Sequence, residues 1–204
     1  EKATTYEVGI KSTLLDRKLQ INAAAFTTAY RDLQLNIQIG TSPTIDNAGS
    51  ARIKGFEIEV TAAPVSGLTL TGSLGYVDAK FNRLDAAALV NASPIPGIQA
   101  GIFVGAPLPK TPKLKTNFSP RYETKLGNGG GIILLADWTH SSKVENDIAR
   151  TLATRRSSYD LVNASITYEE PGDNWTLTVG GTNLTDKRYF TSGGANLAAG
   201  GIFG

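Results

Sequence analysis

The sequence predicts an all-β chain that forms part of a transmembrane, antiparallel, up-and-down β-barrel. Three observations lead to this fold class. Apolar and polar residues alternate with a period of two along several segments, which is typical of strands with two different faces. Tight turns and long connections alternate between these segments. No run approaches the roughly 18 apolar residues that a membrane-spanning helix needs, whereas a barrel strand needs only about 10.

The composition narrows the class of protein further. Hydrophobic residues make up 41% and charged residues 19% of the 204 residues, which is too polar for a helical membrane protein and not polar enough for a disordered chain. The formal net charge of +2 is dispersed, so no basic stripe exists and no nucleic-acid partner is expected. The absence of cysteine excludes disulfides and thiolate metal sites. Because the chain starts at Glu1 without a leader, we expect a piece of a longer protein.

The first four strands form two expected hairpins. Strands from Thr5 to Leu14 and from Leu19 to about Ala25 are joined by a tight turn at 16–18. The cleanest alternation follows, from Phe56 to Ala62 and from Leu68 to Tyr76, across a turn at 64–67.

Four further strands form two more hairpins, which brings the total to about eight strands. Lys113 to Thr124 and Gly131 to Ser142 flank a glycine-rich turn, whose glycines can adopt positive φ. The second of these strands begins with 132–135, which is apolar on both faces. Val162 to Tyr168 and Trp175 to Gly180 flank the last turn.

The connections between the hairpins are long. We expect loops over Asp32–Ser50, Phe81–Pro112, Lys143–Ser158 and Lys187–Gly204. Structureless loops of this length are uncommon in compact soluble domains, but outer-membrane barrels have short turns on one side and long loops on the other. Aromatic residues near strand ends can form the girdles of a barrel or cap a sandwich core, and the loop pattern favours girdles. They are Tyr76, Tyr122, Trp138, Tyr168 and Trp175.

Alternation assigns each strand residue to one of two faces. We expect the apolar set to contact lipid and the polar set to face the lumen. The lipid-facing candidates are Phe56, Ile58, Val60, Leu70, Leu74, Val162, Ile166, Leu177 and Val179. The lumen-facing candidates are Glu57, Glu59, Thr69, Thr71, Thr176 and Thr178.

Two motifs resemble those of a known family. The run from Asn47 to Glu59 resembles the pattern N-x-G-x-x-x-x-x-G-x-E, and its matching residues are Asn47, Gly49, Gly55 and Glu57. A later segment resembles N-L-x-D-K-x-Y, and its matching residues are Asn183, Leu184, Asp186, Lys187 and Tyr189. In this order, the two motifs make the chain similar to the TonB-dependent receptors of bacterial outer membranes.

The resemblance implies that residues 1–204 are one part of a barrel of about 22 strands, with the N-terminal plug domain and the last strand absent. Residues 200–204, at the end of the sequence, are interpreted as a loop and not as the last strand of the barrel. The implied function is the active import of a scarce ligand, foremost a ferric siderophore. The implied partners are the outer-membrane lipid bilayer, the ligand, and the TonB complex, which would act through the plug.

Candidate catalytic residues are few. His140 is the only histidine, and a Ser-His-acid triad with Asp137 would also need a nucleophile motif that is absent, so a histidine at the barrel rim is favoured. Glu57 and Glu59 could pair as catalytic carboxylates or cation ligands, but lining a wet lumen is the favoured role. We therefore expect no enzyme activity and no catalytic, cofactor or metal site.

Two other functions stay open at this point. A passive porin or structural barrel would lack a plug and would not need TonB. A soluble β-sandwich binding module would be soluble without detergent.

Overall fold

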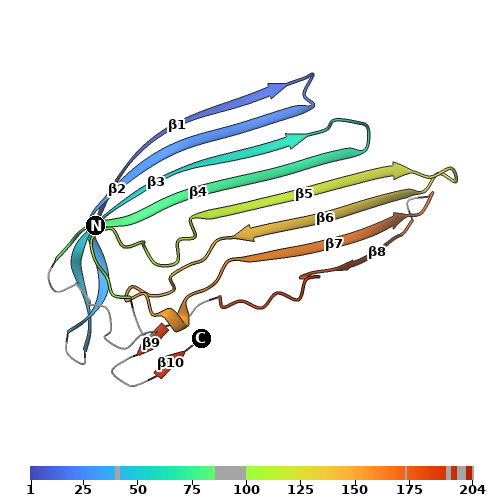
Figure 1. Ribbon diagram of the computed structural model, residues 1–204. Helices are drawn as coiled ribbons and strands as arrows, with labels where there is room; N and C mark the ends of the chain where they lie inside the picture. Colours follow the sequence, from blue (N-terminus) through green and yellow to red (C-terminus); the bar gives the residue numbers. More distant parts are fainter. Residues whose placement is uncertain (40–41, 86–99, 173, 192–193, 197–200, 204) are drawn as a thin grey trace.

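A computed structural model of the chain describes residues 1–39, 42–85, 100–172, 174–191, 194–196 and 201–203. Eight strands form one antiparallel sheet in which spatial order follows chain order (Figure 1). The strands are β1 (Lys2–Leu14), β2 (Leu19–Ile39), β3 (Ser42–Ala62), β4 (Leu68–Leu84), β5 (Leu114–Lys125), β6 (Gly131–Ser141), β7 (Tyr159–Glu169) and β8 (Thr176–Gly181). The expected all-β, up-and-down arrangement of eight strands is confirmed.

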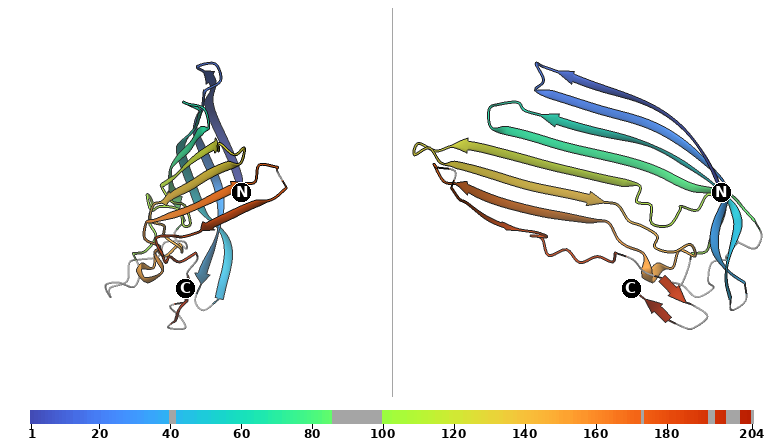
Figure 2. Two further views of the ribbon diagram at one scale, coloured as in Figure 1. Left: turned by 90° about the vertical axis from the view of Figure 1, so that its right-hand side faces the viewer. Right: turned by 180° about the vertical axis from the view of Figure 1, so that it is seen from behind.

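The sheet is a twisted, curved wall (Figure 2). Its two edge strands, β1 and β8, do not pair with each other, so these eight strands alone do not close a barrel. The short turns lie at one end of the wall, and the long connections gather at the other end (Figure 1). We call these the turn end and the loop end. Among the described residues, no helix is long and apolar enough to span a membrane.

Local sequence explains the tight turn between β5 and β6. Between β5 and β6, Gly129 has a φ of 89°, a conformation that glycine adopts without steric cost, as expected for this glycine-rich segment. Its amide donates to the carbonyl of Leu126 at 2.9 Å, which closes the turn. Between β1 and β2, Leu15, Asp16 and Arg17 all have positive φ.

The prediction of a loop over Asp32–Ser50 is wrong. β2 and β3 continue as a paired hairpin through most of it, so Ile39 lies opposite Ser42. The extension starts at an irregularity in the register between Tyr30 and Gln34, where Asp32 has a φ of 54°. Such bulges bend a strand without ending it, and the extended hairpin turns away from the wall (Figure 1). Apolar and polar residues alternate again after the bulge, and this signal is the one that sequence reasoning passed over.

Three other expected boundaries also differ. β4 continues to Leu84, so the loop expected from Phe81 begins later. The expected loop over Lys187–Gly204 contains a small hairpin of β9 (Gly194–Asn196) and β10 (Gly201–Phe203). β1 begins at Lys2 instead of Thr5. The loop expected over 143–158 is confirmed, and it contains one short 3₁₀ helix, Leu152–Thr154.

The buried hydrophobic core lies under the long connections. Phe81, Ile102 and Ala106 are almost fully buried there, and four half-buried residues pack around them. These are Leu33, Leu84, Leu108 and Ile148, which come from β2, β4 and two connections. The wall itself has little buried apolar surface, because nothing in the described chain covers either of its faces.

Candidate functional site: a two-faced wall and its loop end

The register of the strands places the apolar and polar residues on opposite faces of the wall. Ile58 lies opposite Ala23 and Leu74, whereas Glu57 lies opposite Ala24 and Gly75. When the pairing is followed from strand to strand, the nine lipid-facing candidates all lie on one face of the wall. The six lumen-facing candidates all lie on the other face. We call them the apolar face and the polar face.

No strand or helix of the described chain covers the apolar face. Large side chains stay well exposed on it, such as Ile58 at 37%, Ile166 at 46% and Val179 at 63%. A contiguous exposed apolar surface of this extent is foreign to a soluble monomer. Two pairs of aromatic rings add to this apolar surface. Phe56 and Tyr76 stack with ring centroids 5.6 Å apart, and the ring centroids of Tyr168 and Trp175 are 5.4 Å apart.

The polar face is hollowed near β1 to β3. A cavity of about 410 Å³ lies there between Glu7, Lys11, Glu57 and Glu59. The Asn22 side chain donates to Glu59 at 3.5 Å. Thr69 and Thr71 lie on the neighbouring strand, but Thr176 and Thr178 lie at the far edge, on β8. The structure therefore brings the six polar candidates to one face without gathering them into one cluster.

Sequence reasoning missed a polar network centred on Asp137 in the middle of this face. Ser119 donates to Asp137 Oδ2 at 2.6 Å and Asn117 at 2.7 Å, while Thr139 and Asn163 donate to Oδ1 at 3.4 and 3.3 Å. The donors come from β5, β6 and β7, so the network ties three strands together. Only the strand register reveals it, because the residues are far apart in sequence.

The glycines of the first motif are required by close approaches. A Cβ on Gly55 would overlap the Tyr76 carbonyl and lie 2.6 Å from the Phe26 ring. A Cβ on Gly49 would overlap the carbonyl of Arg83. These two positions therefore exclude larger residues for reasons of packing. Asn47 and Glu57 are both exposed on β3.

The second motif builds the turn that follows β8. Asn183 has a φ of 50° and its side chain clamps Lys187, accepting from the Lys187 amide at 2.9 Å and donating to its carbonyl at 3.1 Å. The Leu184 amide donates to the Val162 carbonyl at 2.8 Å, which keeps this segment against β7. Tyr189 stacks on Tyr159 with ring centroids 4.1 Å apart. The motif residues thus fix the path of the backbone at the loop end.

His140 lies on the apolar face near the loop end. Its Nδ1 is 2.9 Å from Asp160 Oδ1, and the Trp138 indole donates to the same oxygen at 3.1 Å. Asp137 lies on the opposite face, because residues at odd and even positions of β6 alternate. No triad of Asp137 and His140 is therefore possible. Among the described residues, no group of His, Cys, Asp and Glu could hold a metal ion.

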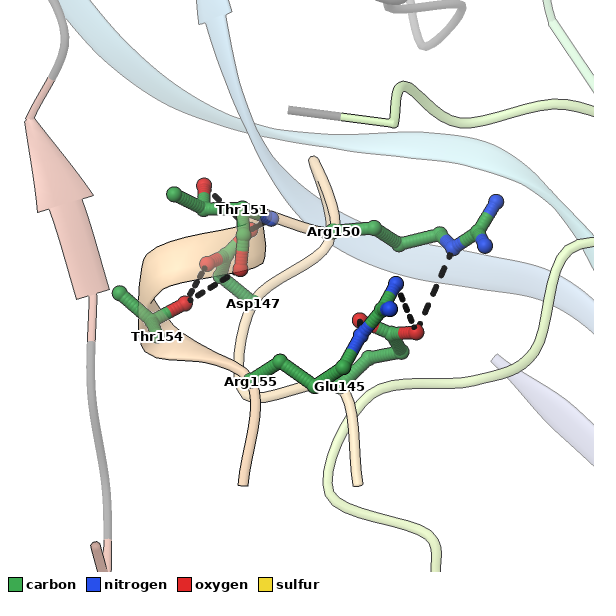
Figure 3. A network of polar contacts seen from close by, with 6 residues as sticks. All are labelled: Glu145, Asp147, Arg150, Thr151, Thr154 and Arg155. Atoms are coloured by element: carbon green, nitrogen blue, oxygen red, sulfur yellow. Dashed lines mark hydrogen bonds and ion pairs between the residues drawn. The ribbon is translucent and has the colours of Figure 1, made fainter. Parts of the chain in front are cut away.

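The connection between β6 and β7 is held by a second network (Figure 3). Asp147 accepts hydrogen bonds from the Thr151 amide at 3.1 Å, the Thr151 hydroxyl at 3.2 Å and the Thr154 hydroxyl at 2.7 Å. The Glu145 side chain, only 10% exposed, pairs with Arg155 at 2.8 Å and with Arg150 at 3.9 Å. Every charge in this network is partly withdrawn from water, so its pairing matters for local stability.

This connection is joined to the one between β4 and β5. The amides of Ala100 and Gly101 donate to the carbonyls of Arg150 and Ala149 at 3.1 and 3.0 Å. The Arg150 guanidinium lies over the Phe103 ring, 5.3 Å from its centroid. The described part of the connection between β4 and β5 is therefore held against the connection between β6 and β7 at the loop end.

A family model described as "TonB dependent receptor-like, beta-barrel" matches residues 1–184. The chain belongs to this family. The resemblance that the two motifs indicate is thus confirmed. The family is one of outer-membrane β-barrel receptors and transporters, which agrees with the expectation that the chain is not an enzyme.

Relatives of this receptor segment cover nearly all of it. A probable TonB-dependent siderophore receptor PiuA from Acinetobacter baumannii is 26% identical over 193 residues, which is 94% of this chain and 24% of the relative. The crystal structure of the siderophore receptor PiuA from that species has a TM-score of 0.72 at 27% identity, over 93% of this chain and 25% of that one.

A more distant structure shows the same fold. The ferric yersiniabactin uptake receptor FyuA from Yersinia pestis has a TM-score of 0.75 at 20% identity, over 95% of this chain and 26% of that one. The segment therefore spans about a quarter of the length of the relatives that it matches.

Proposed function

We propose that this segment is part of the wall and outer loops of an outer-membrane receptor that imports a ferric siderophore by TonB-dependent transport. The observation that carries the proposal is the division of one family-matched sheet into an open apolar face and a hydrogen-bonded polar face. An apolar face of this kind suits contact with lipid, and the polar face suits a water-filled interior. The relatives named as siderophore receptors support the ligand class.

The proposal assigns the partners of each face. The bilayer contacts Ile58 and its neighbours, and the interior holds Glu57, Glu59, Thr69, Thr71, Thr176 and Thr178. Small residues on the polar face, such as Gly75 and Gly180, suit a wide barrel of about 22 strands closed by strands outside this chain. The plug domain that would fill the interior, and through which the TonB complex would act, also lies outside residues 1–204.

The test is uptake by cells that carry the complete protein. Radioactive ferric siderophores are supplied to a strain that lacks its own receptors, with TonB intact or deleted. We expect accumulation of at least one ferric siderophore only when TonB is present. Accumulation of small solutes that is independent of TonB would instead identify a passive porin and overturn the proposal.

A further inference from the structure

Charged residues are distributed unevenly over the apolar face of the wall. On the described strands β1 to β8, the half of this face next to the turn end has no charged side chain. Where the strand pairing of β1 to β4 is regular, the half next to the loop end has five cations and only one carboxylate, Asp78. We call the five cations the cationic rim, and they are Lys2, Arg31, Arg52, Lys54 and Lys80.

The cationic rim places like charges directly opposite each other. Lys2 is paired with Arg31 between β1 and β2, and Arg52 is paired with Lys80 between β3 and β4. Like charges in directly opposed positions of an antiparallel pair repel each other and destabilise the sheet. An anion from outside the sheet that lay between two such cations would remove this repulsion.

The one carboxylate on this part of the face is already engaged. Asp78 Oδ2 lies 2.9 Å from Lys80 Nζ, and Asp78 Oδ1 lies 3.7 Å from Lys113 Nζ. The other four cations of the rim are exposed and form no ion pair with any residue that the structure describes. They are Lys2, Arg31, Arg52 and Lys54. The edge of the apolar surface therefore has a marked excess of positive charge.

The height of the cationic rim matches the outer part of the apolar band. Lys54 and Arg52 lie eight and ten residues from the end of β3 at Ala62. At about 3.3 Å per residue and a strand tilt of about 45°, they lie about 19 and 23 Å from the turn end. The apolar band of such barrels is about 25 Å tall. Long basic side chains at this height can extend to the level of the lipid head groups.

We propose that the cationic rim binds the phosphate groups of an anionic glycolipid of the outer leaflet, of the lipid A class. The forked guanidinium of an arginine matches two phosphate oxygens, and a lysine adds a point charge. Basic residues that cluster at a membrane boundary attract anionic head groups in this way. A phosphate between Arg52 and Lys80 would also relieve the repulsion between these two side chains.

The surroundings of the cationic rim favour a lipid over an acidic protein. The stacked rings of Phe56 and Tyr76 lie on the same face, next to Lys54 and Asp78 on the side of the turn end. Acyl chains of a lipid bound at the rim would cover these rings. The inference rests on the proposed function, because the loop end must face the outer leaflet. Lipids of the inner leaflet would meet the turn end, where this face has no charge on the described strands.

The test measures binding of lipid to the complete receptor in detergent micelles by native mass spectrometry. The probes are lipid A with two phosphate groups and the same lipid after both phosphates have been removed. We expect the phosphorylated lipid to bind roughly tenfold or more tightly. Arg52→Gln and Lys54→Gln should each weaken its binding about fivefold, the effect of one basic residue near a membrane surface, and should change binding of the dephosphorylated lipid little.

Lys115→Gln is the matched control, because Lys115 is an exposed cation on the polar face, opposite Gly75. Its removal should leave lipid binding unchanged. If Arg52→Gln does not fold, Lys54→Gln carries the test alone. Equal binding of the two lipids, unchanged binding in both rim variants, or an equal loss in Lys115→Gln would overturn the inference.

Tighter binding of phosphatidylglycerol or of polyglutamate than of lipid A would also overturn it, because these probes stand for an inner-leaflet lipid and an acidic protein. The measurement needs neither TonB nor a siderophore. A receptor that imports a siderophore without binding lipid A therefore contradicts only this inference, and one that binds lipid A without importing contradicts only the proposed function.

Discussion

An arginine at Ile58 would test the membrane-facing role of the apolar face. Ile58 lies four residues from the end of β3 at Ala62. At about 3.3 Å per residue and a strand tilt of about 45°, this places it about 9 Å above the turn end. The apolar band of such barrels is about 25 Å tall, so Ile58 lies about a third of the way through a band that starts at the turn end. An arginine there should cost up to about 2–4 kcal/mol, which is the range at the midplane.

Glu57→Arg is the matched control, because it introduces the same side chain one residue away on the polar face. We expect it to change the free energy of unfolding by no more than roughly 0.5 kcal/mol, as is usual for solvated surface positions. Guanidinium titration of the complete receptor in lipid vesicles measures both values. Equal costs at the two positions would refute the assignment of the faces.

Three further outcomes are expected. Gly55→Ala should lower the free energy of unfolding by roughly 1–3 kcal/mol, because the new Cβ overlaps the Tyr76 carbonyl. Gly75→Ala is the control and should be neutral, because its Cβ meets only Glu57 Cγ at 3.9 Å. Equal guanidinium midpoints for the two variants would contradict this. Glu145→Gln should speed trypsin cleavage of the connection between β6 and β7, because Arg155 and Arg150 lose a buried partner. Glu123→Gln breaks only an exposed pair with Arg121 and should leave the cleavage rate unchanged. Equal cleavage rates in the two variants would count against a stabilising network. Residues 1–204 expressed alone should aggregate, since β1 and β8 have unpaired edges, and a discrete monomeric pore in bilayer conductance recordings would show that no further strands are needed.

The strands of the wall were predictable because their signal is local. Alternation in Phe56 to Ala62 reflects two environments on two faces, and it does not depend on what the strand pairs with. The same property explains the missed extension of β2. Asp32 adopts a positive φ in a bulge, and a polar residue at that point reads as the start of a loop although pairing resumes beyond it.

The loop end was not predictable in the same way. The Asp137 network joins three strands, and the pairing of Arg150 with Glu145 depends on how a connection folds back on itself. A pocket of about 400 Å³ lies between residues 155–159 and residues 187–190, which are neighbours only after β7 and β8 have paired. Such contacts depend on register and loop closure, for which a single sequence has no periodic signal.

A cysteine scan along β3 tests the central claim most directly. These 204 residues have no cysteine, so single substitutions from Phe56 to Thr61 can each carry a nitroxide label in the complete receptor. We expect labels at 56, 58 and 60 to collide mainly with oxygen, which concentrates in lipid, and labels at 57, 59 and 61 to collide mainly with a water-soluble nickel chelate. Accessibilities that do not alternate, or that alternate in the opposite phase, would contradict a wall with lipid on one face and water on the other.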